Sequence, residues 1–116
     1  MITTAHAAIT TEELLSSQVV TFNTSELGND AAGQRIWDDV QLAVKDFAGH
    51  LVLNMARVQY VSSTALGKLV SLQGKLKERG GTLALCGVCQ AVVEVFRVTR
   101  LDGVLDCRAN VEQAVR

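Results

Sequence analysis

The feature that most restricts the fold is an alternation of short apolar runs with segments of helical periodicity. Residues 18–22, 50–55 and 82–86 are short runs rich in aliphatic side chains, as the covered strands of a parallel sheet require. Residues 31–47 and 64–79 repeat apolar side chains every three or four positions, which indicates amphipathic helices. Strands joined by helices pair in parallel through right-handed crossovers. We therefore predict an α/β fold with a small mixed, largely parallel β-sheet and helices packed mainly on one face.

The remaining segments continue this alternation to the end of the chain. Apolar residues within 91–96 predict a third helix, residues 104–105 a short final strand, and residues 111–116 a last turn or two of helix. Residues 25–30 contain Gly and Asn and predict a loop.

One domain accounts for the whole sequence. A chain of 116 residues, 48% of them hydrophobic, has the common size of a single domain and enough apolar side chains for one core. We expect residues 1–16 to form an N-terminal tail or a short edge strand around residues 9–14. Residues 17–116 are expected to form the domain itself.

Charge and cysteine content narrow the classes of partner. The net charge of −1 argues against nucleic acid or an anionic membrane as the partner, because both are bound through basic surfaces.

No apolar run reaches the roughly 18 residues of a membrane span, so no membrane insertion is expected, and the N-terminus does not resemble a signal peptide. Three cysteines and two histidines favour a reducing, cytoplasmic setting without a disulfide framework, a metal or a cofactor.

Three consecutive hydroxyl side chains, Ser62, Ser63 and Thr64, open the helix predicted over residues 64–79. Helix capping explains one of them, because a Ser or Thr oxygen accepts the free amide hydrogens of a first turn. A phosphate switch is the alternative. A phosphate is tolerated at the positive end of a helix and adds about −1.5 to −2 charges, and no Asp or Glu lies in this first turn to repel it.

The region around these hydroxyls also resembles a known family. Residues 51–67, LVLNMARVQYVSSTALG, are similar to the signature of STAS domains, the family of bacterial anti-sigma factor antagonists: an apolar strand, a polar link, an aromatic or apolar pair, then Asp-Ser-Ser-Gly-Leu-Gly. Ser62 replaces the family's Asp, and Ala65 replaces its first Gly. Residues 85–105 resemble the family's last strand, helix and strand. The resemblance as a whole covers about residues 18–110. The matching positions in the signature are Tyr60, Val61, Ser63, Thr64, Leu66 and Gly67.

The resemblance implies a non-enzymatic regulator that works by partner switching. The unmodified domain, a monomer or weak dimer, would bind an anti-sigma factor that is also a serine protein kinase. Phosphorylation of Ser63, with Ser62 and Thr64 as second choices, would end the complex, and a matching phosphatase would restore it. The implied docking surface comprises Tyr60, Val61, Ser62, Ser63, Thr64, Ala65, Leu66, Gly67, Lys68 and Ser71.

Two alternatives remain open from the residues. An accessory STAS subunit could dock a transporter or a signalling scaffold without any phosphorylation. A thiol redox protein is the enzymatic alternative, because Cys86 and Cys89 form a Cys-X-X-Cys pair between a predicted strand and a predicted helix, a setting that can lower a thiol pKa. Trp37 is expected in the core, with an interface anchor as the other interpretation.

Overall fold

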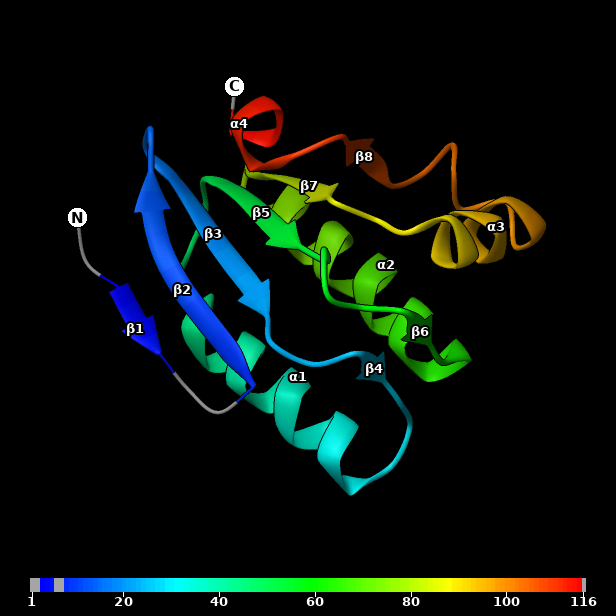
Figure 1. Ribbon diagram of the computed structural model, residues 1–116. Coiled ribbons are helices and arrows are strands. Elements are labelled where there is room, and N and C mark those ends of the chain that lie inside the picture. The colour runs from blue at the N-terminus through cyan, green and yellow to red at the C-terminus, as the bar shows by residue number, and fades with distance from the viewer. Residues whose placement is uncertain (1–2, 6–7, 116) are drawn as a thin grey trace.

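The computed structural model describes residues 3–5 and 8–115 (Figure 1). This part of the chain forms a six-stranded sheet, a separate two-stranded sheet and four helices. In chain order the elements are β1 (Thr3–Ala5), β2 (Ile9–Leu14), β3 (Ser17–Phe22), β4 (Glu26–Leu27), α1 (Ala31–Ala43), β5 (His50–Asn54), β6 (Tyr60–Val61), α2 (Ser63–Glu78), β7 (Thr82–Cys86), α3 (Gln90–Val98), β8 (Asp106–Arg108) and α4 (Val111–Ala114).

The large sheet has the strand order β1-β2-β3-β5-β7-β8. β1, β2 and β3 pair antiparallel, whereas β3, β5, β7 and β8 pair in parallel. The apolar runs that predicted strands lie side by side at the centre, where Val20 pairs with Leu53 and Leu53 with Leu85. The prediction of a mixed, largely parallel sheet is confirmed.

Most of the core lies between the sheet and the first three helices. Leu53 and Leu85 from the sheet pack in one cluster with Val40 of α1, Leu69 of α2 and Phe96 of α3. The short helix α4 lies on the opposite face, where Ala114 and Val115 cover Val19, Val52 and Ala84. Helices therefore lie mainly, but not only, on one face, as Figure 1 shows.

His50 ties α4 to the sheet. Its Nε2 lies 2.6 Å from the carbonyl oxygen of Ala114, and its Nδ1 lies 2.6 Å from the hydroxyl of Thr82. Because a carbonyl oxygen can only accept, Nε2 carries the hydrogen and Nδ1 accepts from Thr82 in the neutral ring. This histidine thus has a structural role at the start of β5.

Trp37 is a core residue. Its side chain is almost fully buried and meets the ring of Phe22 edge to face, with ring centroids 5.9 Å apart. Among the described residues its indole Nε1 has no hydrogen-bond partner. Packing of two large rings therefore holds α1 against β3, and the interpretation of Trp37 as an interface anchor is wrong.

The N-terminal strand predicted around residues 9–14 is present as β2, but it does not lie at the edge of the sheet. β1 pairs with its outer side, and Ile9 is fully buried. The Thr and Ala residues of β1 carry little strand signal, so its backbone pairing could not be predicted from composition.

Three element boundaries also differ from the prediction. Helix α1 ends at Ala43 rather than at residue 47, and Arg79 donates to the carbonyl oxygens of Val44 and Phe47 where the chain turns. The last strand is Asp106–Arg108 rather than residues 104–105. All three residues of β8 are exposed, so backbone pairing with β7, and not an apolar run, defines that strand. The predicted loop over residues 25–30 contains strand β4.

Candidate functional site

The segment between β5 and α2 lies at the carboxyl end of the parallel strands. Its apolar side chains Met55, Val58 and Val61 are buried and fix the path of the backbone. The amide of Met55 donates to the carbonyl oxygen of Cys86 at 2.9 Å, which joins this segment to the end of β7. Ligands and partners of open α/β sheets commonly bind at this edge.

A second segment, distant in sequence, clamps the backbone just before α2. β4 and β6 pair in parallel, with Glu26 opposite Tyr60 and Leu27 opposite Val61 (Figure 1). Further hydrogen bonds join the amide of Tyr60 to the carbonyl oxygen of Ser25 at 3.2 Å and the amide of Ser62 to that of Leu27 at 2.9 Å. The clamp holds Tyr60 with its side chain 55% exposed. The sequence contained no signal for this pairing, because each strand has only two residues.

The three hydroxyl residues have different environments. Ser62 is the N-cap of α2: it is only 4% exposed, and its Oγ accepts the amide hydrogen of Ala65 at 3.1 Å. Ser63 and Thr64 form the first turn of the helix, and both are exposed. Since Ser and Asp are both strong N-caps, Ser62 caps the helix at the position where the family signature has Asp. Capping therefore accounts for Ser62 and leaves Ser63 unexplained.

Replacing the cap should destabilise the domain. We expect Ser62→Ala to lower the free energy of unfolding by about 1–2 kcal/mol, because the amide of Ala65 loses its acceptor at a buried position. Chemical denaturation of Ser62→Ala, Ser63→Ala and Thr64→Ala under the same conditions measures this. The last two variants remove exposed hydroxyls and should stay within about 0.5 kcal/mol of the wild type. Equal losses in all three variants would contradict the assignment of the cap.

The residues of the predicted docking surface divide into a supporting set and an accessible set. Val61, Ser62, Ala65 and Leu66 are buried and hold the start of α2 on the core. Lys68 is half-buried, and the exposed members are Tyr60, Ser63, Thr64, Gly67 and Ser71.

Two features of this surface were not predicted from the sequence. Val70 is 36% exposed beside the accessible residues of α2, although its aliphatic side chain is typical of a core position. Strand β4 brings the exposed carboxylate of Glu26 opposite Tyr60. The helix itself has no acidic residue in its first turn, so Glu26 adds a negative charge that only the tertiary structure reveals.

The surface on α2 is unusually open at its glycine. A Cβ atom added at Gly67 would meet no heavy atom within 4 Å, so neither packing nor a special backbone angle requires glycine there. An exposed glycine inside a helix costs about 1 kcal/mol relative to alanine. The absence of a side chain at Gly67 leaves the helix backbone open to close approach by another molecule.

The environment of Cys86 argues against the redox alternative. Its side chain is fully buried, and burial raises the pKa of the thiol to about 11. Catalytic thiols need a lowered pKa, because the thiolate is the nucleophile. Cys89 occupies the N-cap position of α3 and makes no side-chain capping bond, and both cysteines are free thiols.

No helix within residues 3–5 and 8–115 combines the length and the apolar character needed to cross a bilayer.

Comparison with known families agrees with the resemblance in the sequence. The model of the STAS domain family matches residues 4–114, which is nearly the whole chain, so this protein belongs to the STAS domain family.

Solved structures show the same fold at low sequence identity. A STAS domain protein from Planctomyces limnophilus, described as an anti-sigma-factor antagonist, is 22% identical and superposes with a TM-score of 0.80 over 94% of this chain and 96% of the other. The anti-sigma factor antagonist SpoIIAA in its unphosphorylated form is 20% identical, with a TM-score of 0.73 and 93% of each chain covered. The murine anion transporter Slc26a9 is 19% identical, with a TM-score of 0.65, and the match covers 90% of this chain but only 18% of the transporter.

Proposed function

We propose that this protein is a partner-switching regulator that binds an anti-sigma factor through the surface at the start of α2. In this proposal the partner is a serine kinase, it phosphorylates Ser63, and the phosphate ends the complex until a phosphatase removes it. The switch operates in the cytoplasm, where the kinase and ATP are present. The similarity to structures described as anti-sigma factor antagonists supports the proposal.

The observation that carries the proposal is the contrast between two adjacent serines. Ser62 is buried and engaged as the N-cap, whereas Ser63 is exposed at the first position of the helix. A kinase can reach the hydroxyl of Ser63 without opening the helix. Phosphorylation of Ser62 would remove the cap from the amide of Ala65 and expose a buried segment. Ser63 is therefore the preferred acceptor, with Thr64 as the exposed second choice.

A phosphate on Ser63 would change binding more than folding. The N-terminus of a helix carries a partial positive charge and unpaired amide hydrogens, which accommodate a phosphate. The same phosphate adds about two negative charges and a solvation shell to a surface that a partner must approach closely. The complex is thus weakened while the domain stays folded.

Substitutions at Ser63 test the switch. We expect Ser63→Asp to weaken binding to a kinase-class anti-sigma factor from the same organism by about tenfold. The reason is that the carboxylate places a negative charge in the interface with the partner. Ser63→Ala should bind like the wild type and should not be phosphorylated. Calorimetric titration measures the affinities, and mass spectrometry after incubation with kinase and ATP locates the phosphate.

Ser63→Asn is the matched control, since it has nearly the shape of Ser63→Asp without the negative charge and should bind like the wild type. A phosphate found on Ser62, or equal affinities for Ser63→Asp and Ser63→Ala, would contradict the switch.

A second candidate function has support of its own. The similarity to the STAS region of an anion transporter favours a docking role without phosphorylation, as an accessory subunit of a transporter or signalling scaffold. In that case Ser63 would stay unmodified in protein purified from its native cells, and Tyr60 and Gly67 would still be needed for binding. Intact-mass measurement of the native protein separates the two roles.

A further inference from the structure

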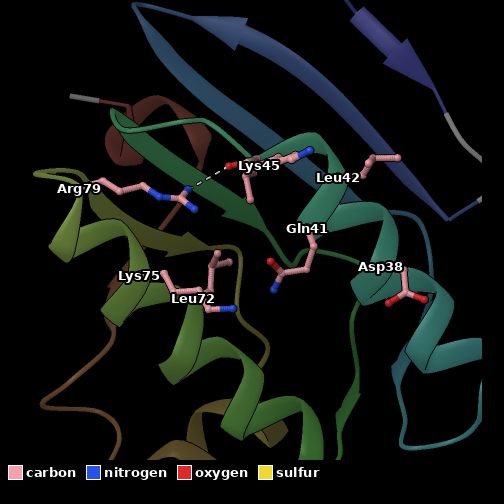
Figure 2. Close-up of a pocket in the computed structure, with 8 residues that line it drawn as sticks. Asp38, Gln41, Leu42, Lys45, Leu72, Lys75 and Arg79 are labelled. Atoms are coloured by element: carbon pink, nitrogen blue, oxygen red, sulfur yellow. Dashed lines mark hydrogen bonds between the residues drawn. The ribbon is translucent and has the colours of Figure 1, made fainter.

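The end of the molecule opposite the proposed docking surface carries a groove between α1 and α2. It has a volume of about 440 Å³, and Val44 and Leu72 form its buried floor. Figure 2 shows Gln41 pointing from α1 toward α2, whereas the side chain of Leu42, which also lines the groove, points away from α2. Leu42 is 74% exposed, so this groove combines an apolar floor with a large apolar side chain that the described structure leaves uncovered.

The groove is basic, in a chain whose net charge is −1. Lys45, Lys75 and Arg79 line it together with one carboxylate, Asp38. Asp38 accepts a hydrogen bond from Gln34 at 2.9 Å, and Arg79 binds backbone oxygens at the end of α1. Within residues 3–5 and 8–115, neither Lys45 nor Lys75 forms an ion pair. Two lysines are therefore available to an acidic ligand.

The same chain carries a segment with the complementary chemistry. The hairpin between β2 and β3 ends in Leu15, which is 73% exposed, and Glu12 and Glu13 precede it on β2. Glu13 is exposed and Glu12 is half-buried. An acidic strand end with a projecting leucine matches a groove with two unpaired lysines and an apolar floor.

The turn between β2 and β3 has residue types that do not suit its backbone conformation. Leu15 and Ser16 both have positive φ, at 50° and 65°, as the two central residues of a hairpin turn of type I′ do. Such turns favour Asn and Gly, because a side chain with a bulky Cβ substituent is strained in the left-handed region. A leucine at this position is unfavourable both for the backbone and for its exposure to water. Backbone outliers of this kind are common at functional positions.

The two features lie at the same end of the domain. The hairpin leads into the start of β3, and the helices α1 and α2 end where the chain enters β5 and β7. Since β3, β5 and β7 are parallel, the hairpin and the groove share the amino-terminal edge of the sheet. Ser63 is the first residue of α2 and therefore lies at the opposite end of this helix, at the carboxyl-terminal edge of the sheet.

We propose that two copies of this chain form a symmetric dimer in which the β2–β3 hairpin of each copy docks in the α1–α2 groove of the other. Leu15 enters the groove, and Glu13, which lies on the same face of β2 as Ile9, faces Lys45 and Lys75. A two-fold arrangement satisfies both sites at once, as is usual in homodimers. The contact leaves the surface at Ser63 free, so a dimer could engage two partners.

Charge reversal tests the pairing of the two sites. We expect the wild-type protein to dimerise reversibly in sedimentation equilibrium, more weakly at high salt because the exposed charges are screened. The hairpin variant Glu13→Lys and the groove variant Lys45→Glu with Lys75→Glu should each dimerise at least about tenfold more weakly. An equimolar mixture of the two variants should form a heterodimer, because the reversed charges attract again. The control variant Lys68→Glu with Lys77→Glu changes the net charge by the same amount as the groove variant. Both of its substitutions lie outside the groove, so it should dimerise like the wild type.

The substitution Leu15→Asn separates a role of Leu15 in dimerisation from a role in folding. Asn tolerates positive φ and suits a solvent-exposed turn, so the variant monomer should resist denaturation better than the wild type, yet it should dimerise about tenfold more weakly because the apolar anchor is lost. Unchanged dimerisation of Leu15→Asn would overturn the proposal, and so would a failure of the mixed variants to associate. A wild-type protein that stays monomeric at every concentration would overturn the proposal as well.

Discussion

Gly67→Arg is expected to weaken partner binding strongly while making the domain more stable. Arg is among the better helix formers, so an exposed helical position should gain about 0.5–1 kcal/mol over Gly. Nothing within 4 Å obstructs a Cβ atom at this position. A long charged side chain next to Ser63 and Tyr60 would, however, keep a partner from reaching the backbone of α2. We expect the affinity to fall by about a hundredfold or more, as for a charge forced into the centre of an interface.

Gly74 supplies a matched control on the same helix. It is also exposed, and an added Cβ atom would again meet no atom within 4 Å. Gly74→Arg should therefore raise stability by a similar amount, yet it lies beyond Ser71 and should change the affinity far less. Titration of both variants against the same anti-sigma factor, together with thermal unfolding of each, measures the two effects. Loss of binding in both variants to the same extent would show that the docking surface extends further along α2 than proposed.

Gly33→Ala is expected to destabilise the domain by about 2–4 kcal/mol, although it replaces glycine by the best helix former. A Cβ atom at Gly33 would lie 2.1 Å from the carbonyl oxygen of Gly28 and 2.8 Å from its carbonyl carbon. Both are backbone atoms of the segment that joins β4 to α1, so they cannot move aside as a side chain could. Relief would require α1 to shift away from β4.

The same substitution at Gly74 gives the opposite sign and serves as the control. Gly74→Ala should raise the free energy of unfolding by about 0.5–1 kcal/mol, since only helix propensity changes there. Urea denaturation of the two variants measures the difference. A stabilising effect of Gly33→Ala would mean that α1 does not pack on Gly28 as closely as the structure indicates.

Gly33 is also important for the proposed site, because displacement of α1 would disturb β4. β4 carries Leu27, which is fully buried and paired with Val61. We therefore see the start of α1, the β4 clamp and the start of α2 as one mechanical unit. The proposed docking surface depends on the position of Tyr60 and would benefit from this rigid support.

Local patterns were sufficient to predict the central elements. β3, β5 and β7 are buried, so their apolar runs identified them, and α2 has one apolar stripe and one polar face. The shortest strands could not be identified from such local patterns. β1, β4, β6 and β8 have two or three residues each, and their stability comes from backbone hydrogen bonds that almost any sequence can form. Their pairing depends on which backbone lies beside them, and that is not encoded in their own side chains.

The sequence by itself determined that three hydroxyl side chains open a helix after a buried strand, and this feature led to the STAS family. Only the tertiary structure decided their environments: Ser62 turns inward and caps the helix, Ser63 faces solvent, and β4, from a distant part of the chain, pairs with β6 just before them. Only the tertiary structure likewise placed the strained Leu15 hairpin and the basic groove at one edge of the sheet. Periodicity and capping are properties of neighbouring residues, whereas burial and the meeting of distant segments arise when the whole core packs together.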